Sequence, residues 1–312
     1  MNETNIVIES VVPKKTVTNK ARRREALSGY LFIVPNLLAM FVFVVIPILT
    51  SLVLSFTNWD LLNPPQFVGL ENYTKKMIED DQFWISLKHT AVFSLITIPV
   101  GITLSLFFAL LLNQAIKGVN IYRAVVFLPV VISMISISMV WRWVFNTDVG
   151  ILNFLLNFFG IDPIGWISDE KFALVSVAIV AIWKSIGFNM VILLAGLKNV
   201  PSHLYEAAKI DGAGTMTKLF KITIPLLTPS LFFVSIMSII SSFQVFDVVY
   251  MITGGGPGDS TRVLYYWLWQ NAFNFFQMGY ASALAWVVFI LLFIVTLLQM
   301  KFFGNKVNYE LD

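Results

Sequence analysis

A glycine-rich stretch, Gly254–Thr261 (GGGPGDST), is the part of this chain that most nearly matches a phosphate-binding loop. The nucleotide loop with the spacing G-x4-G-K-[ST] needs a lysine that reaches the phosphates. No lysine lies in this stretch. We therefore interpret it as a turn that ends an apolar run.

Residues for hydrolytic or metal chemistry are equally scarce. The chain has no cysteine, and its two histidines, His89 and His203, lie far apart in the sequence. We find no Ser/His/Asp set, no paired-carboxylate cleft and no HExxH motif where water and a substrate could meet. The sequence therefore predicts no catalytic residue, no metal site and no cofactor held by this chain, so we do not expect an enzyme.

Polar side chains inside long apolar runs are the remaining candidates for chemistry, because their burial in hydrocarbon is costly. They are Trp183, Lys184, Ser185, Phe188, Asn189, Ser238, Ser241, Ser242, Gln244 and Asp247, counting the aromatic residues between them. We expect them to line a path for a polar, uncharged solute. Two alternatives stay open: Lys184 forms a structural pair, and the serines serve close helix packing.

The composition indicates that the surrounding solvent is a bilayer. The 312 residues are 57% hydrophobic and 12% charged, with a mean hydropathy of +0.79, whereas soluble domains carry about 25% charged residues. Six apolar runs are long enough to cross about 30 Å of hydrocarbon. They are Leu27–Phe56, Leu87–Leu112, Ile121–Phe145, Phe172–Leu197, Pro225–Ile252 and Tyr280–Phe302.

The predicted organisation is an all-α integral membrane protein with six transmembrane helices. We expect a basic cytoplasmic tail over residues 1–28, a first transmembrane helix over 29–56 and an extracytoplasmic loop over 57–86. A five-helix core over 87–303 follows, with a cytoplasmic loop at 198–224, and 304–312 form a cytoplasmic tail. Pro35 and Pro47 are expected to kink the first, uncleaved span.

The distribution of basic residues predicts the orientation. Fourteen fall on the side of the termini, namely Lys14, Lys15, Lys20, Arg22, Arg23, Arg24, Lys117, Arg123, Lys198, Lys209, Lys218, Lys221, Lys301 and Lys306. Five fall on the other side, namely Lys75, Lys76, Lys88, Lys171 and Arg262. We therefore expect both termini, and the polar segment 202–230, in the cytoplasm.

Segment 202–230 (SHLYEAAKIDGAGTMTKLFKITIPLLTPS) is a polar island between two apolar runs. Ser202 is expected to cap a short helix over about 204–210, and Asp211-Gly212-Ala213-Gly214 to form a turn. Thr215 is expected to cap a second short helix that ends before Pro225. The two helices would form a bent connector between the fourth and fifth spans.

This connector resembles the EAA loop of ABC importer permeases, whose pattern is E-A-A-x3-G-x9-I-x-L-P. Only the penultimate leucine differs, replaced by Ile224. The resemblance implies that the connector docks on a separate ATPase subunit. The residues that carry this coupling role would be Glu206, Ala207, Ala208, Gly212, Ile222 and Pro225.

More of the chain, from about Ala26 to Phe303, is similar to the first permease of heterodimeric carbohydrate importers. The resemblance implies a type I ABC importer fold, a second homologous permease, two cytoplasmic ATPase subunits that use ATP and Mg²⁺, and an extracytoplasmic solute-binding protein. It also implies a location in the plasma membrane of a prokaryote, in contact with lipid and not with nucleic acid. The expected cargo is a di- or oligosaccharide or a related polyol.

Other functions are weighed against this one. Glycerol phosphate or another small polar solute is an alternative cargo for a permease of this kind. An ion-coupled secondary transporter would call for intramembrane acids and repeat symmetry, but Asp247 is the only acid well inside an expected span and no internal repeat is visible. A membrane scaffold without transport would leave the EAA-like loop without a partner.

Overall fold

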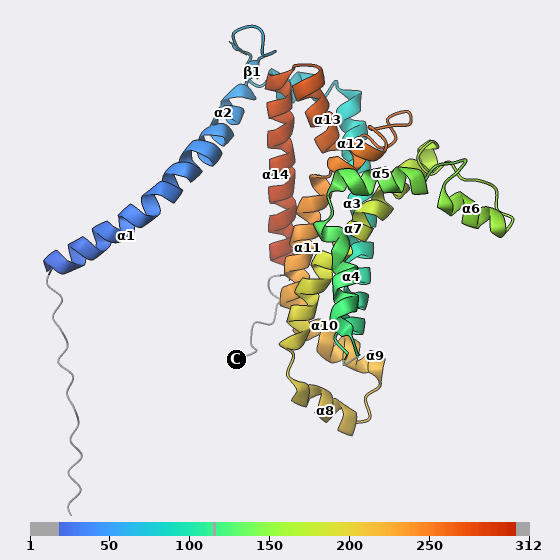
Figure 1. The fold of residues 1–312 in the computed structure, drawn as a ribbon. Helices are drawn as coiled ribbons and strands as arrows, with labels where there is room; N and C mark the ends of the chain where they lie inside the picture. Colours follow the sequence, from blue (N-terminus) through green and yellow to red (C-terminus); the bar gives the residue numbers. More distant parts are fainter. Residues whose placement is uncertain (1–18, 115–116, 304–312) are drawn as a thin grey trace, which may run out of the picture. The chain divides into compact units, whose positions relative to one another are not determined.

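The computed structural model describes residues 19–114 and 117–303 (Figure 1). The predicted tail over 304–312 and most of the tail over 1–28 lie outside these residues. The chain divides into two compact units, one up to Val53 and one from Leu54 onward. Each unit is described by itself.

The first unit is a helix with an apolar surface. α1 (Asn19–Met40) passes into a π-helical turn, η1 (Phe41–Val45), and then into α2 (Ile46–Leu54). Residues Leu27–Leu54 are long and apolar enough to cross a membrane. Pro35 lies inside α1. The wide π turn ends two residues before Pro47, whose ring would otherwise clash with the carbonyl four residues earlier.

The second unit begins with a small hairpin followed by long helices. The hairpin pairs β1 (Thr57–Asn58) with β2 (Gln66–Phe67) in antiparallel register. The elements that follow are η2 (Asn72–Lys76), α3 (Asp81–Leu112), α4 (Val119–Val131), α5 (Met134–Val144), α6 (Ile151–Phe158) and α7 (Glu170–Lys198). We call the end of this unit at which α3 and α7 begin the hairpin end.

The rest of the unit holds a bent connector and two more long helical segments. The connector, here called the hook (residues 202–226), consists of α8 (Ser202–Ile210), α9 (Thr215–Lys218), η3 (Leu219–Thr223) and α10 (Ile224–Leu226). After it come α11 (Thr228–Phe243), α12 (Asp247–Ile252), α13 (Leu264–Trp269), η4 (Gln270–Asn274) and α14 (Met278–Phe303). Figure 1 shows α8 beyond the ends of α7 and α11, opposite the hairpin end.

The number of membrane-spanning segments agrees with six only if bent helices count as spans. In the described residues four helices are long and apolar enough to cross, and two bent pairs raise the number to six. The pairs are Val119–Val131 with Met134–Val144, bent by 98°, and Thr215–Leu226 with Thr228–Phe243, bent by 70°. The third span, expected as a single helix, is therefore bent between α4 and α5. The 70° bend lies at the start of the expected fifth span, which is interrupted separately between α11 and α12.

The core is formed chiefly where α3 packs along α7 (Figure 1). One apolar cluster gathers Phe93, Val177 and Val249 with residues of α5, and a second gathers Ala109, Met190 and Leu227. Many large apolar side chains of the long helices, such as Leu95 and Phe107 of α3 and Phe289 and Phe293 of α14, are exposed in the isolated chain. This pattern suits helices whose outer faces contact lipid.

Three expected helix ends in the hook are wrong. The N-cap residue of α8 is Pro201, whose backbone is extended. Ser202 is therefore the first helical residue, and no side-chain hydrogen bond caps this helix. Gly214 takes the same position ahead of Thr215. The second helix does not stop before Pro225 but runs through it to Leu226. The π turn over Leu219–Thr223 leaves room for the proline ring one turn later.

Candidate functional site

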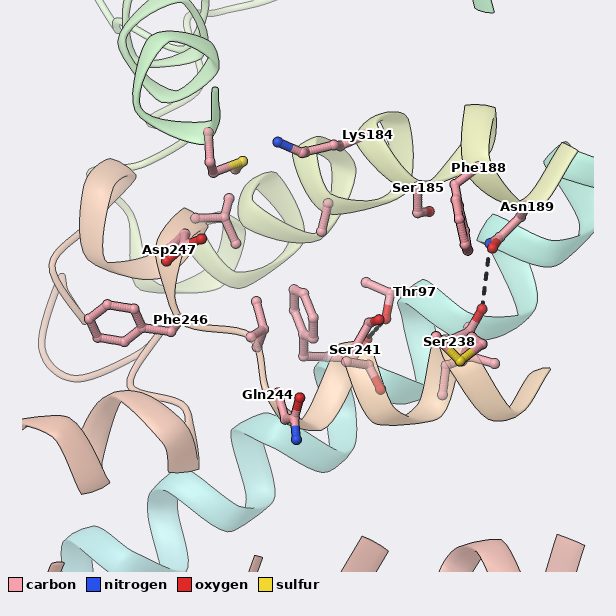
Figure 2. Close-up of a pocket in the computed structure, with 18 of the residues that line it drawn as sticks. Thr97, Lys184, Ser185, Phe188, Asn189, Ser238, Ser241, Gln244, Phe246 and Asp247 are labelled. Carbon is pink, nitrogen blue, oxygen red and sulfur yellow. Dashed lines mark hydrogen bonds between the residues drawn. The ribbon is translucent and has the colours of Figure 1, made fainter. Parts of the chain in front are cut away.

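Two regions bring the candidate residues together, and the first is a cavity in the middle of the second unit (Figure 2). Its volume is about 600 Å³. It is lined from α3, α4, α5, α7, α11, α12 and α13 and from the connector that joins α11 to α12. Nine of the ten expected pathway residues line it: Lys184, Ser185, Phe188, Asn189, Ser238, Ser241, Ser242, Gln244 and Asp247.

Trp183 is the one expected pathway residue that does not line this cavity. Its ring packs edge-on against Trp141 of α5, with 5.6 Å between the ring centroids. Trp183 directly precedes Lys184 on α7, and one helical step of 100° carries it from the cavity wall to the α5 side. Trp183 therefore braces α5 on α7.

The sequence analysis missed several lining residues, among them Thr97, Met134 and Tyr265. Thr97 lies on α3, two residues before Pro99, and Tyr265 lies on a short helix far along the chain. The hydroxyl of Thr97, inside an apolar run, was the one signal for a place in the wall. Tyr265 offered no local signal, because only the tertiary fold brings α13 to this wall.

Interrupted helices meet at the cavity. α4 ends at Val131, Ile132 and Ser133 are extended, and α5 sets off at a large angle. α11 ends at Phe243, and the chain is not helical again until Asp247. Such breaks leave backbone groups without helical partners. Polar atoms of the main chain thus add to the side-chain groups available around the cavity.

Lys184 forms a hydrogen bond with the backbone at one of these breaks. Its Nζ donates a hydrogen bond to the carbonyl oxygen of Ile132, at 3.1 Å, just beyond the C-terminus of α4. An ammonium group is favoured there by the helix dipole. Asp247 lies in the first turn of α12, where a carboxylate is favoured in the same way. Figure 2 shows both side chains at the same end of the cavity.

The hydroxyl groups of the wall keep acceptor capacity. Ser185 Oγ donates to the Ile182 carbonyl at 2.9 Å, and Ser242 Oγ donates to the Ile239 carbonyl at 2.9 Å. Thr97 Oγ1 bonds its own helix in the same manner, to the Phe93 carbonyl at 2.8 Å. Each hydroxyl retains oxygen lone pairs after donating its proton. Hydroxyl-rich solutes can donate to such groups.

One side-chain bond crosses the cavity wall, from Asn189 Nδ2 on α7 to Ser238 Oγ on α11, at 3.5 Å (Figure 2). Ser235, one turn earlier on α11, instead receives a hydrogen bond from Gln299 Nε2 of α14. The serines of α11 therefore have different partners, because Ser238 and Ser242 border the cavity and Ser235 joins α11 to α14.

The second region is the hook. α8 ends in a Schellman motif, in which the Ala213 amide donates to the Ala208 carbonyl at 2.8 Å and the Gly212 amide donates to the Lys209 carbonyl at 3.2 Å. Gly212 has φ +74° and so occupies the left-handed position of this motif. A Cβ there would meet nothing within 4 Å. Only the backbone conformation demands glycine at this turn.

The outer surface of the hook carries large apolar side chains at its tip and small side chains at the centre of α8. Glu206 and Ala207 are exposed and Ala208 is partly buried. Three large apolar side chains, Ile210, Met216 and Phe220, are exposed by 86%, 68% and 65%. We call these three the apolar tip. Unlike the lipid-facing side chains, they stand among lysines and acids on a polar connector.

The base of the hook is joined to the helices that line the cavity. Tyr205 Oη and Thr223 Oγ1 lie 2.9 Å apart and hold α8 against η3. Ile222 and Pro225 are partly buried on this inner side. Leu227, fully buried at the bend, packs in the same cluster as Leu193 of α7. The base of the hook is thus packed against α7 and α11, which form two walls of the cavity.

Comparisons with known proteins agree on the kind of molecule. Residues 101–309 match the family described as "Binding-protein-dependent transport system inner membrane component". The chain is 42% identical over 296 residues to the probable ABC transporter permease protein YesP of Bacillus subtilis, covering 94% of this chain and 95% of that protein. It is 35% identical over 286 residues to the trehalose/maltose transport system permease protein MalF of Thermococcus litoralis, covering 91% and 96%.

Solved structures share the fold. A bacterial ABC transporter involved in the import of the acidic polysaccharide alginate contains a chain that superposes with a TM-score of 0.81 at 18% identity, covering 93% of this chain and 99% of that one. The alginate transporter in complex with an alginate pentasaccharide-bound periplasmic protein gives 0.79 at 19% identity, covering 90% and 94%. The chain belongs to the binding-protein-dependent inner-membrane transport components, the multi-pass permease subunits of ABC importers.

Proposed function

We propose that this chain forms half of the translocation path of an ATP-driven sugar importer, with a di- or oligosaccharide as its cargo. The cavity carries this proposal. It combines hydroxyl and amide groups with the aromatic rings of Phe188, Phe246 and Tyr265. Sugars present hydroxyl groups at their edges and apolar C–H faces, and such a wall offers partners for both.

The names of relatives support a sugar. Besides the trehalose/maltose permease, the chain is 34% identical to the lactose permease protein LacF of Rhizobium radiobacter over 91% of its length. It is also 34% identical, over 88% of its length, to the arabinooligosaccharide permease protein AraP of Bacillus subtilis. These cargoes differ in their sugar units but share the saccharide class. We assign the class and not an individual sugar.

We propose that the hook docks on a separate ATPase subunit that uses ATP and Mg²⁺. Ala207 and Ala208 permit close approach of two backbones, and Glu206 is exposed for pairing with a basic residue. The apolar tip supplies area to bury on contact. The full assembly would comprise this chain, a second homologous permease, two ATPase subunits and an extracytoplasmic binding protein. The hook faces the cytoplasm and the hairpin end faces outward.

In the proposed cycle the cavity opens alternately toward the binding protein and toward the cytoplasm. Closure of the ATPase pair would draw the two hooks together and tilt α7 and α11, because both continue from the hook. The cavity would then open toward the binding protein, and the reverse motion would open it to the cytoplasm. The chain needs a stiff connection for this and no catalytic group.

An anionic solute is a second candidate cargo, favoured by one observation. Lys184 is the cation among the described lining residues, and its single hydrogen bond to Ile132 leaves two of its three N–H donors unused. A glycerol phosphate or an acidic sugar would suit those donors. Asp247 at the same end of the cavity counts against an anion, so the neutral saccharide is the primary proposal.

The test is a substitution inside the cavity. Ser241 is exposed and lines the cavity, so Ser241→Trp fills space that the solute needs, while Ser241→Ala leaves it open. In the complete assembly in vesicles, we expect Ser241→Trp to reduce sugar uptake to background with the ATPase subunits still bound, and Ser241→Ala to retain it. Normal uptake by Ser241→Trp would contradict the proposal. Stimulation of the wild-type ATPase by anionic solutes, and not by neutral sugars, would favour the second candidate.

A further inference from the structure

The short helix α6 has one face fixed to the protein. Asn153 is 4% exposed, and its Nδ2 donates to the carbonyls of Thr147 and Ile164, each at 2.9 Å. Its Oδ1 accepts hydrogen bonds from the Ile164 amide at 3.1 Å and from Trp166 Nε1 at 2.9 Å. Leu152 packs against the apolar cluster of α5 and α7. α6 is therefore held in a defined orientation.

The opposite face of α6 is apolar and open. Phe154, Leu155, Phe158 and Phe159 are exposed by 72%, 50%, 83% and 75%. No charged residue occurs between Asp148 and Asp162. An exposed cluster of three phenylalanines and a leucine is unusual on a surface that meets water, and marks an interaction site.

The location of α6 points to lipid as the occupant. α6 joins α5 to α7 at the hairpin end, and Figure 1 shows it projecting sideways from the bundle, beyond α5. Trp143, 55% exposed, ends α5, and tryptophans favour the level of the membrane surface. A protein-binding face carries a polar rim around its apolar centre. Among the exposed residues of α6 Asn157 is the one polar side chain, and it lies beside the apolar face and does not surround it. α5 likewise exposes Met139, Val140 and Trp143.

We infer that α6 is an interfacial helix, with its phenylalanine face embedded about 5–10 Å into the boundary between headgroups and acyl chains at the hairpin end. This site lies outside the cavity and the hook. Through it the membrane surface contacts the connection between the third and fourth spans.

The anchor is linked to the cavity wall by a series of contacts. Trp166, bonded to Asn153, packs on Phe145 with 6.1 Å between the ring centroids. Phe145 packs on Trp141 at 5.1 Å, and Trp141 packs on Trp183 at 5.6 Å. The helix of Trp141 begins with Met134, which lines the cavity. The lipid surface therefore holds the bent half-span α5, and with it one wall of the cavity.

The test uses the absence of cysteine in this chain. A nitroxide spin label is attached at Phe158→Cys in the complete importer, assembled in lipid bilayers with partner subunits that lack reactive cysteines. We expect the label to collide readily with oxygen, which dissolves in lipid, and poorly with a water-soluble nickel chelate. The matched site is Asn157→Cys, exposed on the same helix one step around it, where the nickel chelate should have the better access.

Two results would overturn the inference. Strong nickel access at Phe158→Cys would place the face in water. Protection from both oxygen and nickel would mean that a protein, the second permease or the binding protein, covers it. If Phe158→Cys fails to assemble, Leu155→Cys reports on the same face, and the same outcomes decide. None of these readouts depends on the cargo.

Discussion

The two ends of the second unit are built in opposite ways. At the hairpin end, Asp80 Oδ2 accepts hydrogen bonds from Trp267 Nε1 at 2.9 Å and from Tyr280 Oη at 2.6 Å. A second group links Gln82, Asp259 and Arg262, with an ion pair of 2.6 Å between the last two. These bonds join residues up to 200 positions apart in the sequence. The hairpin end is therefore held together by its own side chains.

Close packing of α14 on the hairpin also stabilises the hairpin end. A Cβ on Gly279 would clash with the carbonyl oxygen of Thr57, so α14 meets the hairpin without a side chain between them. Lys76 lies over the ring of Tyr280, 4.8 Å from its centroid, and burial lowers the pKa of Lys76 while the charge of Asp80 opposes that shift.

The hook, by contrast, exposes large apolar side chains. Among its described residues the side-chain bonds gather at its base, where Tyr205 and Thr223 meet, and its apolar tip is exposed. An end that satisfies its own groups gains stability from the chain itself. An end that exposes apolar groups gains stability only from a partner. We therefore expect substitutions at the hook to impair coupling, and substitutions at the hairpin end to impair stability.

The largest effect is expected at Gly212. Gly212→Val places a β-branched residue at φ +74°, which costs about 1–3 kcal/mol of strain and distorts the turn between α8 and α9. Uptake should be abolished, or ATP hydrolysis should continue without uptake, while insertion into the membrane stays normal. Gly214→Ala is the matched control, because Gly214 has φ −71° and open space around a Cβ. Full uptake by Gly212→Val would contradict the role given to this turn.

The next effect is expected at the apolar tip. Ile210→Asp puts a charge where we expect an apolar contact, with a loss of about 1.5–3 kcal/mol of burial. Association with the ATPase subunit, measured by co-purification and by titration, should weaken by at least about tenfold. Ile210→Leu should bind normally. Equal affinity of the two variants would show that the tip stays in water.

The smallest effect on transport is expected at the hairpin end. Asp80→Ala leaves the donors of Trp267 and Tyr280 without their acceptor, which costs about 1–3 kcal/mol. The purified protein should unfold at a lower temperature, with ATPase association unchanged. Glu79→Ala, at an exposed neighbouring acid, is the control and should unfold like the wild type. A loss of ATPase association in Asp80→Ala would break the contrast between the two ends.

Sequence reasoning identified the hook because its signals are local. A turn is predicted by the stretch Asp211-Gly212-Ala213-Gly214, and the structure has a Schellman motif there. The failure at Pro225 is also instructive. Proline usually stops a helix, yet a π turn over Leu219–Thr223 accommodates its ring, and π turns have no composition signal.

The cavity was only partly predictable. Polar residues in apolar runs pointed to α7 and α11, since the cost of burying them is visible in the sequence. The break in the third span was not visible as a break, because the run stays apolar up to Ile132. In the fifth span Gln244 and Asp247 border the break, but these polar residues were expected to line the path and were not interpreted as the end of a helix. Phe246 leaves the helical path and stacks on Tyr250, 5.3 Å between ring centroids, and packs near Trp269. Tertiary packing of this kind overrides local preference.

The central claim is that the hook transmits force from an ATPase subunit to the cavity. The most direct measurement is crosslinking from Ala207→Cys, at the exposed centre of α8, in the complete and active importer. The account predicts a crosslink to the ATPase subunit whose yield changes between the ATP-bound and nucleotide-free states. A working importer in which Ala207→Cys, and equally Ala208→Cys, never crosslinks to that subunit would contradict it.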